Sequence, residues 1–180
     1  MDGERKLPMT TRRMIRMKPK RAGEPLFQLR IAGLAFRDGH LLVHRATHES
    51  FWTLPGGRAE IGESSDLTLK REMMEELGVE VGIGRMLWTV ENFFHYEGVD
   101  VHELGFYYLM DVPEHFPFHR SDIVHRNIDG KSELEFKWVL ATSDSLRALD
   151  IPPYFLAETI ESLPETPRHI IWHDGDLDRP

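Results

Sequence analysis

Three glutamates, Glu72, Glu75 and Glu76, lie close together in a segment whose other residues favour a helix. At about 100° per residue, counted from Leu67, their side chains fall at roughly 140°, 80° and 180°, a single arc about 100° wide. The apolar residues of the segment fall on the rest of the circle, at roughly 200° to 340° (Leu69, Met73, Leu77 and Met74). One face of the helix should therefore be buried, and the other should present clustered carboxylates.

Carboxylates three and four residues apart on a helix repel one another, and a divalent cation between them would offset that repulsion. Hard oxygen ligands suit Mg²⁺ or Mn²⁺, which take their remaining ligands from water and substrate phosphates. Glycine lets the backbone approach such an ion closely, and Gly56 and Gly57 lie just upstream. The pattern thus predicts a metal site at Glu72, Glu75 and Glu76, with backbone carbonyls of the Gly56-Gly57 loop close to the ion. The alternative is an ordinary solvated acidic face, which is what most glutamate clusters on helices are.

The helix that carries these carboxylates is expected over residues 65–77. Ser64 or Ser65 supplies an N-cap, and Gly78 stands where a C-terminal glycine belongs. Arg71, at roughly 40° on the same count, borders the carboxylate arc and can hold a glutamate side chain as a bidentate partner.

Strands are predicted on both sides of this helix. Apolar runs at 31–36 and 41–43 flank the turn Asp38-Gly39 and predict a hairpin, and further β-favouring stretches follow (51–54, 86–90, 102–110, 135–140 and a short edge strand at 170–172). Residues 113–132 read as a long loop, and residues 154–163 as a second helix. This order predicts an α/β fold, a mixed sheet flanked by helices. We expect one domain over 26–163, a basic arm over 1–25 and a tail over 164–180.

The composition limits the function further. The 180-residue chain has 22 basic and 30 acidic residues, a net charge of −8, which disfavours a broad nucleic-acid-binding surface. Cysteine is absent, which excludes disulfides, thiolate zinc sites and cysteine nucleophiles and fits a reducing compartment, so we expect a cytoplasmic protein. No apolar run approaches the roughly 20 residues that span a bilayer. The basic arm reads as a solvated leader, or as an arm that docks on a second subunit.

The segment from Gly57 to Val79 resembles the Nudix box, G-x5-E-x7-R-E-U-x-E-E-x-G-U, in which U is a bulky aliphatic residue. Every fixed position of the box is filled (Gly57, Glu63, Arg71, Glu72, Glu75, Glu76 and Gly78). The resemblance covers residues 26–163 and leaves both ends unaccounted for. It implies a Nudix-type α/β/α sandwich and Mg²⁺-dependent hydrolysis of a nucleoside diphosphate linked to another moiety, which releases a nucleoside monophosphate.

The resemblance also implies roles for the box residues. Glu72, Glu75 and Glu76 match metal-binding carboxylates, and Gly56 matches a position whose carbonyl can ligate. Glu63 and Arg71 match the positions that brace the loop and helix. The general base varies within the family, so the candidates are the box glutamates and two carboxylates from a later strand, Glu133 and Glu135.

The second half of the substrate depends on residues outside the box. Asn92, Phe94 and Tyr96 combine aromatic faces with polar groups that could stack on a base or sugar, although packing under a loop is an equal alternative. Arg45 could reach a phosphate, the alternative being a surface ion pair, and Arg58 is a further substrate-binding candidate. We expect a nucleotide-type small-molecule substrate: a nucleotide sugar, a dinucleoside polyphosphate or a nucleoside triphosphate.

Other functions and assemblies stay open at this level. A non-catalytic nucleotide-binding or regulatory module is the alternative function, although such modules usually lose box carboxylates and none is lost here. The isomerase branch of the fold uses a cysteine, which this chain lacks. The basic arm or residues 170–172 could cover a neighbour's sheet edge, which would give a homodimer.

Overall fold

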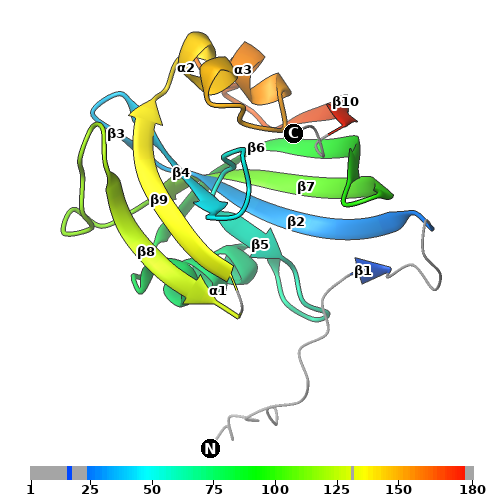
Figure 1. Ribbon diagram of the computed structural model, residues 1–180, viewed down its shortest axis with the longest axis horizontal. Coiled ribbons are helices and arrows are strands. Elements are labelled where there is room, and N and C mark those ends of the chain that lie inside the picture. The colour runs from blue at the N-terminus through cyan, green and yellow to red at the C-terminus, as the bar shows by residue number, and fades with distance from the viewer. Residues whose placement is uncertain (1–15, 18–23, 131, 177–180) are drawn as a thin grey trace, which may run out of the picture.

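The computed structural model describes residues 16–17, 24–130 and 132–176, and its strands form two sheets (Figure 1). A six-stranded sheet has the order β1-β2-β7-β6-β10, with β5 paired to β2, and a four-stranded sheet has the order β3-β4-β9-β8. The strands of the larger sheet are β1 (Arg16–Met17), β2 (Leu26–Leu34), β5 (Gly56–Arg58), β6 (Gly82–Tyr96), β7 (Val99–Asp111) and β10 (Arg168–Asp176). Those of the smaller sheet are β3 (Phe36–Arg37), β4 (His40–Ala46), β8 (Ile123–Asp129) and β9 (Ser132–Leu140).

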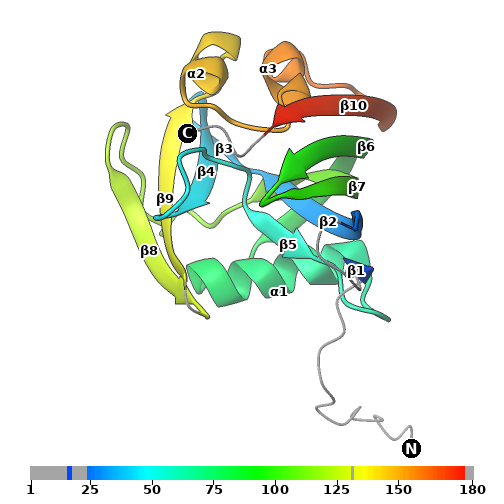
Figure 2. The ribbon, with the colours of Figure 1, turned by 45° about the vertical axis from the view of Figure 1, so that its right-hand side comes forward.

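Helices lie on both sides of these sheets (Figure 2). Helix α1 (Ser65–Leu77) lies on one side, and α2 (Ser143–Ala148) and α3 (Phe155–Thr159) lie on the other. The larger sheet is mixed, because β2–β7 and β6–β10 are parallel pairs whereas β6–β7 is antiparallel. The expected α/β fold is confirmed, with two sheets in place of one.

Helix α1 begins and ends where its sequence predicts. Gly78 adopts the left-handed conformation (φ 68°) that ends a helix at little cost for glycine. Ser64 is extended, as an N-cap should be, but its hydroxyl donates to Asp66 instead of capping the helix. Of the apolar residues expected on its inner face, Leu69, Met73 and Leu77 are buried, whereas Met74 is 44% exposed.

Three predictions about the elements are wrong. Residues 51–54 do not form a strand, because only Thr53 pairs, in an isolated bridge with His44. Residues 113–132 are not all loop, because β8 forms an antiparallel pair with β9 around a tight turn at Gly130 (φ 59°). This edge strand carries polar residues at its centre, so its apolar pattern is weak. The second helix is also shorter than predicted, since α3 has five residues, and the six-residue helix α2 precedes it.

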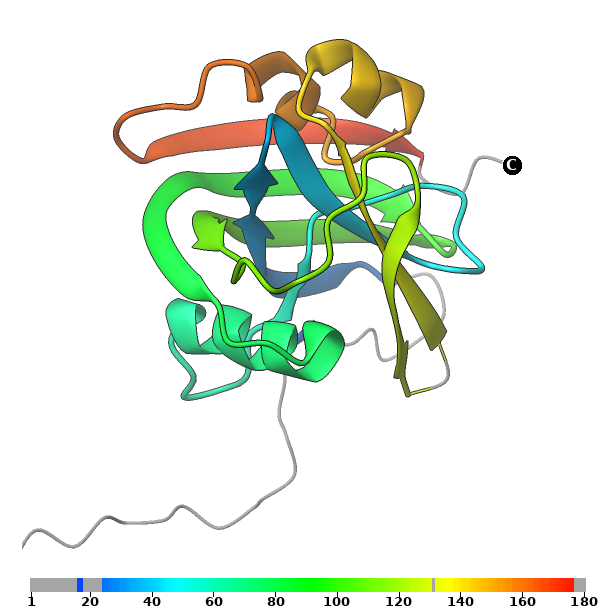
Figure 3. The same ribbon diagram turned by 90° about the vertical axis from the view of Figure 1, so that its left-hand side faces the viewer.

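The two ends of the chain differ in what is described. The basic arm lies mostly outside the described residues; Arg16 and Met17 form β1 and pair with Gln28 and Phe27 of β2. The tail forms β10, a longer strand than predicted, which pairs in parallel with β6 at the sheet edge away from α1 (Figure 3). None of the helices in the described part of the chain combines the length and apolarity needed to cross a bilayer.

Candidate active site

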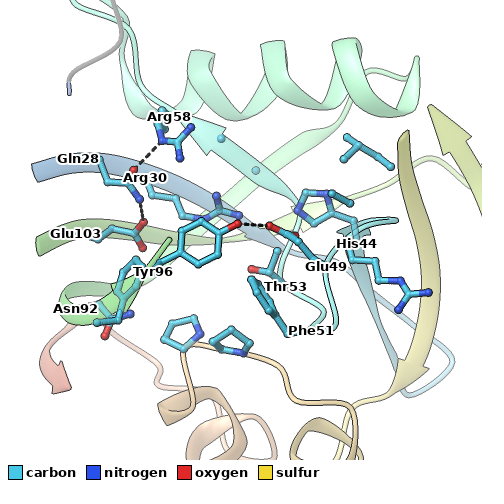
Figure 4. Close-up of a pocket in the computed structure, with 18 of the residues that line it drawn as sticks. Gln28, Arg30, His44, Glu49, Phe51, Thr53, Arg58, Asn92, Tyr96 and Glu103 are labelled. Atoms are coloured by element: carbon cyan, nitrogen blue, oxygen red, sulfur yellow. Dashed lines mark hydrogen bonds between the residues drawn. The ribbon is translucent and has the colours of Figure 1, made fainter. Parts of the chain in front are cut away.

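A cavity of about 550 Å³ is lined by residues from both sheets and from α1. Figure 4 shows Gln28, Glu103 and Asn92 on one side of it and His44 on the other. We call the side formed by Gly57, Glu72, Glu76 and His44 the box end. The side formed by Gln28, Asn92, Glu103 and Asp174 is the distal end; all of these residues line the cavity.

At the box end the glycine loop lies directly against α1. A Cβ atom on Gly57 would overlap the Glu72 carboxylate, and one on Gly56, whose φ is 145°, would overlap the carbonyl oxygen of Ile31. Both positions therefore require glycine, since only its bare backbone leaves room for this approach. The result is a backbone loop held against a buried carboxylate at the edge of a cavity.

Arg71 and Glu63 brace this arrangement. The Arg71 Nε and Nη2 atoms donate to the two Glu63 carboxylate oxygens at 2.9 and 3.1 Å, and Nη1 donates to Glu72 at 2.8 Å and to Glu75 at 3.3 Å. Burial alone would raise the pKa of Glu63, but hydrogen bonds from Arg71 and Thr68 outweigh it and lower that pKa. Burial raises the pKa of Glu72, against the opposing effect of Arg71.

Glu76 lies deeper than the other box carboxylates. It is 6% exposed, and its Oε2 atom is 3.7 Å from Nδ1 of His44 on β4. The His44 ring stacks on Phe136 at 5.2 Å, and burial, together with the charge of Arg30, lowers the pKa of His44 to about 3. His44 is thus a neutral imidazole beside Glu76, a contact that the sequence analysis did not predict.

The donor chemistry of the box end fits a divalent cation. Glu72 and Glu76 supply hard carboxylate oxygens beside a glycine loop, and a Cβ atom on Gly57 would fill the space next to the Glu72 carboxylate. Glu75 lies about one helical turn after Glu72. Within the described residues, no three histidine or acidic side chains are already gathered tightly enough to hold a metal. Glu72 and Glu75 are bonded to Arg71 instead, so ion binding would draw these side chains together.

The five residues predicted to bind substrate all line the cavity: Arg45, Arg58, Asn92, Phe94 and Tyr96. The Tyr96 hydroxyl donates to Glu49 at 2.7 Å, and its ring meets Phe51 edge to face at 6.1 Å. Arg45 also stacks over Trp52 at 4.6 Å. The structure therefore brings these residues together, and their contact with substrate stays a prediction.

Glu135, a predicted candidate for the general base, lies apart from the box glutamates. It pairs across the smaller sheet with Arg45 at 3.2 Å and with Arg126 at 2.9 Å, and these hydrogen bonds, that of Arg126 first, lower its pKa. Its neighbour Phe136 contacts His44, and successive strand residues point to opposite faces. Glu135 therefore faces away from Glu76, and Glu133, 53% exposed, lies near Arg126 at 3.9 Å.

Several cavity residues were not predicted, and strand register explains why. Gln28 and Arg30 interrupt the apolar run of β2 at every second residue, a signal that both side chains leave the core on one face. Arg30 donates to the Leu54 carbonyl at 3.0 Å. Glu103 lines the cavity because it lies between Gln28 and Asn92, its partners on the two neighbouring strands of the sheet. Nothing in the sequence pointed to Asp174, which reaches the cavity through β10.

The fold and the box end together define a domain of the Nudix type. The NUDIX domain family matches residues 27–143, well over half of the chain, and the chain therefore belongs to this family.

Curated relatives match part of the chain. A MutT-like protein of Streptomyces ambofaciens is 35% identical over 69 residues, 38% of this chain and 45% of that protein. The mouse diphosphoinositol polyphosphate phosphohydrolase 3-alpha is 39% identical over 69 residues, 36% of this chain and 42% of that protein. The chain spans less than half of the length of the curated relatives it matches first.

Solved structures support the fold. A UDP-X diphosphatase superimposes with a TM-score of 0.55 at 14% identity, covering 79% of this chain and 66% of that one. A MutT protein from Bacillus halodurans has a TM-score of 0.54 at 16% identity, covering 81% and 89%. At these identities the likeness concerns the fold alone.

Proposed function

We propose that this chain is a Mg²⁺-dependent pyrophosphohydrolase. Its substrate is a nucleoside diphosphate linked to another moiety, and its products are a nucleoside monophosphate and a second phosphorylated compound. One observation carries the proposal: the Gly57 backbone lies against the Glu72 carboxylate, beside Glu76, at the mouth of a cavity that also holds Arg30 and Arg58.

Each group has a role in this proposal. Glu72, Glu75 and Glu76, with the Gly56 carbonyl, would hold the ion, and Arg71 and Glu63 would keep the helix and loop in place. When bound, Mg²⁺ supplies charge neutralisation of the diphosphate and a more acidic bound water.

The arginines bind and orient the substrate. Arg30 and Arg58 are directly paired across β2 and β5, so their side chains leave the same face of the sheet, and both line the cavity next to the glycine loop. Planar guanidinium groups bind phosphate oxygens in pairs, which would fix the diphosphate for in-line attack. The proton of the attacking water would pass to a box carboxylate, since Glu135 points to the other face of its sheet and is bonded to two arginines.

The relatives are consistent with this class of reaction. The printed names of the mouse relative and of one solved structure specify a phosphohydrolase and a diphosphatase. The names differ in substrate, so they support only the reaction class. The identity of the moiety linked to the diphosphate has to be inferred from the residues that line the cavity.

A screen tests the proposal directly. Purified protein is incubated with nucleotide sugars, dinucleoside polyphosphates, nucleoside triphosphates and oxidised deoxynucleotides, with Mg²⁺, with Mn²⁺ or with EDTA, and phosphorylated products are measured. We expect metal-dependent release of a nucleoside monophosphate. Binding of Mn²⁺, followed by its EPR signal, should weaken in Glu72→Gln and stay unchanged in Glu80→Gln, an exposed carboxylate just beyond α1. Nucleotide binding without any product would instead indicate the non-catalytic module.

We also propose a cytoplasmic homodimer. The absence of cysteine is consistent with the reducing compartment. Ile171 on the edge strand β10 is 62% exposed, which suits a second copy covering that edge. Light scattering coupled to size exclusion should give twice the 21.0 kDa chain mass; a monomer at all concentrations would contradict the assembly.

A further inference from the structure

The cations of the cavity are held close to the box end. Arg58 directly follows the glycine loop, and its Nε atom donates to Oε1 of the Gln28 side chain at 2.7 Å. Arg30, its partner across the strands, is tied to the Leu54 carbonyl. These contacts hold the two guanidinium groups between the glycine loop and Gln28, at the border of the two ends, where a diphosphate would lie.

The distal end is built from hydrogen-bond acceptors. Glu103 and Asp174 are carboxylates that are 5% and 8% exposed, and Asn92, 3% exposed, lies between their strands. The Asn92 amide nitrogen donates to Asp174 at 2.9 Å, whereas its carbonyl oxygen has no hydrogen-bond partner in the described part of the chain. A buried carbonyl group without a partner is costly, and a donor from a bound molecule would remove that cost.

Asp174 is fixed from the other side. Its Oδ1 atom accepts hydrogen bonds from the Tyr154 backbone at 3.0 Å and from the Trp172 indole at 2.7 Å. The carboxylate thus holds the Asn92 amide in one orientation, with the nitrogen toward Asp174. All three partners of Asp174 are protein groups, and two of them come from beyond residue 143, where the family match ends.

Flat side chains form the wall beside these acceptors. Phe51 and Tyr96 meet edge to face, and Pro152 and Pro153 also line the cavity. Such faces suit an uncharged planar ring or a sugar.

We propose that the distal end is the subsite for an uncharged group of the substrate that donates hydrogen bonds, and that it rejects a group bearing a further phosphate. The donor is an N–H of a nucleobase or an O–H of a sugar. This inference rests on the proposed function, in which the diphosphate lies at the two arginines. A phosphate placed against the Asp174 carboxylate would set like charges together in a buried site, which selects strongly against it.

The proposal separates this chain from one of its relatives. The printed name of the mouse protein specifies a diphosphoinositol polyphosphate, whose ring carries several phosphates. The arginines nearest the distal end are Arg58, which is bonded to Gln28, and Arg30, and the positive charges of both oppose the rise in the pKa of Glu103. In the proposed function both bind the diphosphate, which leaves no arginine or lysine among the distal-end residues for the further phosphates of such a ring.

A matched pair of probes tests the charge selection: ADP-ribose and ADP-ribose 2′-phosphate, which differ by one phosphate. We expect kcat/KM to be higher for ADP-ribose by about tenfold or more. Asp174→Asn should reduce this ratio to a few-fold, because it removes the charge and keeps an oxygen acceptor. Glu91→Gln is the matched control, since Glu91 precedes Asn92 on β6 but bonds His169 on the other face of the sheet; it should leave the ratio unchanged.

A second pair of comparisons identifies the donor. GTP against ITP removes one base amino group, and GTP against dGTP removes one sugar hydroxyl. In Asn92→Leu, kcat/KM for GTP should fall about tenfold or more. In one of the two pairs, kcat/KM for the compound that lacks the donor, ITP or dGTP, should fall less than about threefold. Which pair responds tells a base donor from a sugar donor; equal losses across both pairs would overturn the role of Asn92.

The outcomes separate this inference from the proposed function. Hydrolysis of ADP-ribose 2′-phosphate or diphosphoinositol pentakisphosphate in preference to ADP-ribose would overturn the distal subsite and leave the hydrolase standing. If no compound is hydrolysed, the binding of ADP-ribose and of ADP-ribose 2′-phosphate is measured by calorimetry in EDTA. Tighter binding of ADP-ribose supports the distal subsite, and equal or absent binding rejects it. Thermal unfolding of each variant shows that the fold is kept.

Discussion

The two ends of the cavity differ in how the chain builds them. The box end comes mainly from one loop and one helix, so that Gly57, Glu72 and Glu76 are close in sequence as well as in space. The distal end joins Gln28, Asn92, Glu103 and Asp174 from strands β2, β6, β7 and β10. Strand register alone brings these four together.

The chemistry of the two ends differs in the same way. At the box end carboxylates surround a glycine backbone and are balanced by Arg71, an arrangement that suits a cation. At the distal end the buried carboxylates accept hydrogen bonds from amides and an indole, an arrangement that suits neutral donors. In the proposed function, the residues of the helix would determine the reaction, whereas those of the sheet would determine the substrate.

The largest effect should come from the box end. Glu76→Gln keeps the shape of the side chain but removes its charge, so it should lower kcat by about 10² or more, as expected when metal or acid–base function is lost. Steady-state hydrolysis at saturating Mg²⁺ measures this, with circular dichroism to show that α1 persists. The Glu80→Gln variant should keep the wild-type rate. A wild-type rate in Glu76→Gln would contradict a role of Glu76 in the reaction.

The glycine loop offers a second way to disturb the box end. Gly57→Ala places a methyl group on the Glu72 carboxylate, so that carboxylate must move and kcat should fall about tenfold or more. Gly82→Ala is the matched control, because its new methyl meets the side chain of the exposed Asp111. If both variants kept full activity, the close approach of loop and helix would have no catalytic role.

The same contrast explains what sequence could reveal. The bounds of α1 and most of its buried face follow from spacing along one helix, and these predictions agree with the structure except at the exposed Met74. Arg30, Glu103 and Asp174 were missed because their proximity depends on which strands pair and in which register. The alternating polar residues of β2 carried part of the signal, but Asp174 lies on a terminal strand that spacing could not place.

A smaller effect concerns stability. Arg71 lowers the pKa of Glu63, so the folded state favours the carboxylate, and this contribution is present above the ordinary pKa of 4.5. It is lost as the pH falls through the lowered folded value. Glu63→Gln should therefore reduce the free energy of unfolding by about 1–2 kcal/mol at pH 7, the size of hydrogen bonds to charged groups. Urea unfolding at several pH values should show this difference shrinking below pH 4.5; a difference that grew in acid would contradict the ion pair.

The smallest effect is expected at Glu135, and it sharpens the comparison most. Because its carboxylate is bonded to Arg45 and Arg126 and faces away from Glu76, Glu135→Gln should change kcat by less than about threefold. Its pH–rate profile should also match that of the wild type, since the acidic limb would report a box carboxylate. A loss of 10² with a shifted acidic limb would identify Glu135 as the general base, and the smaller sheet would then share the reaction with α1.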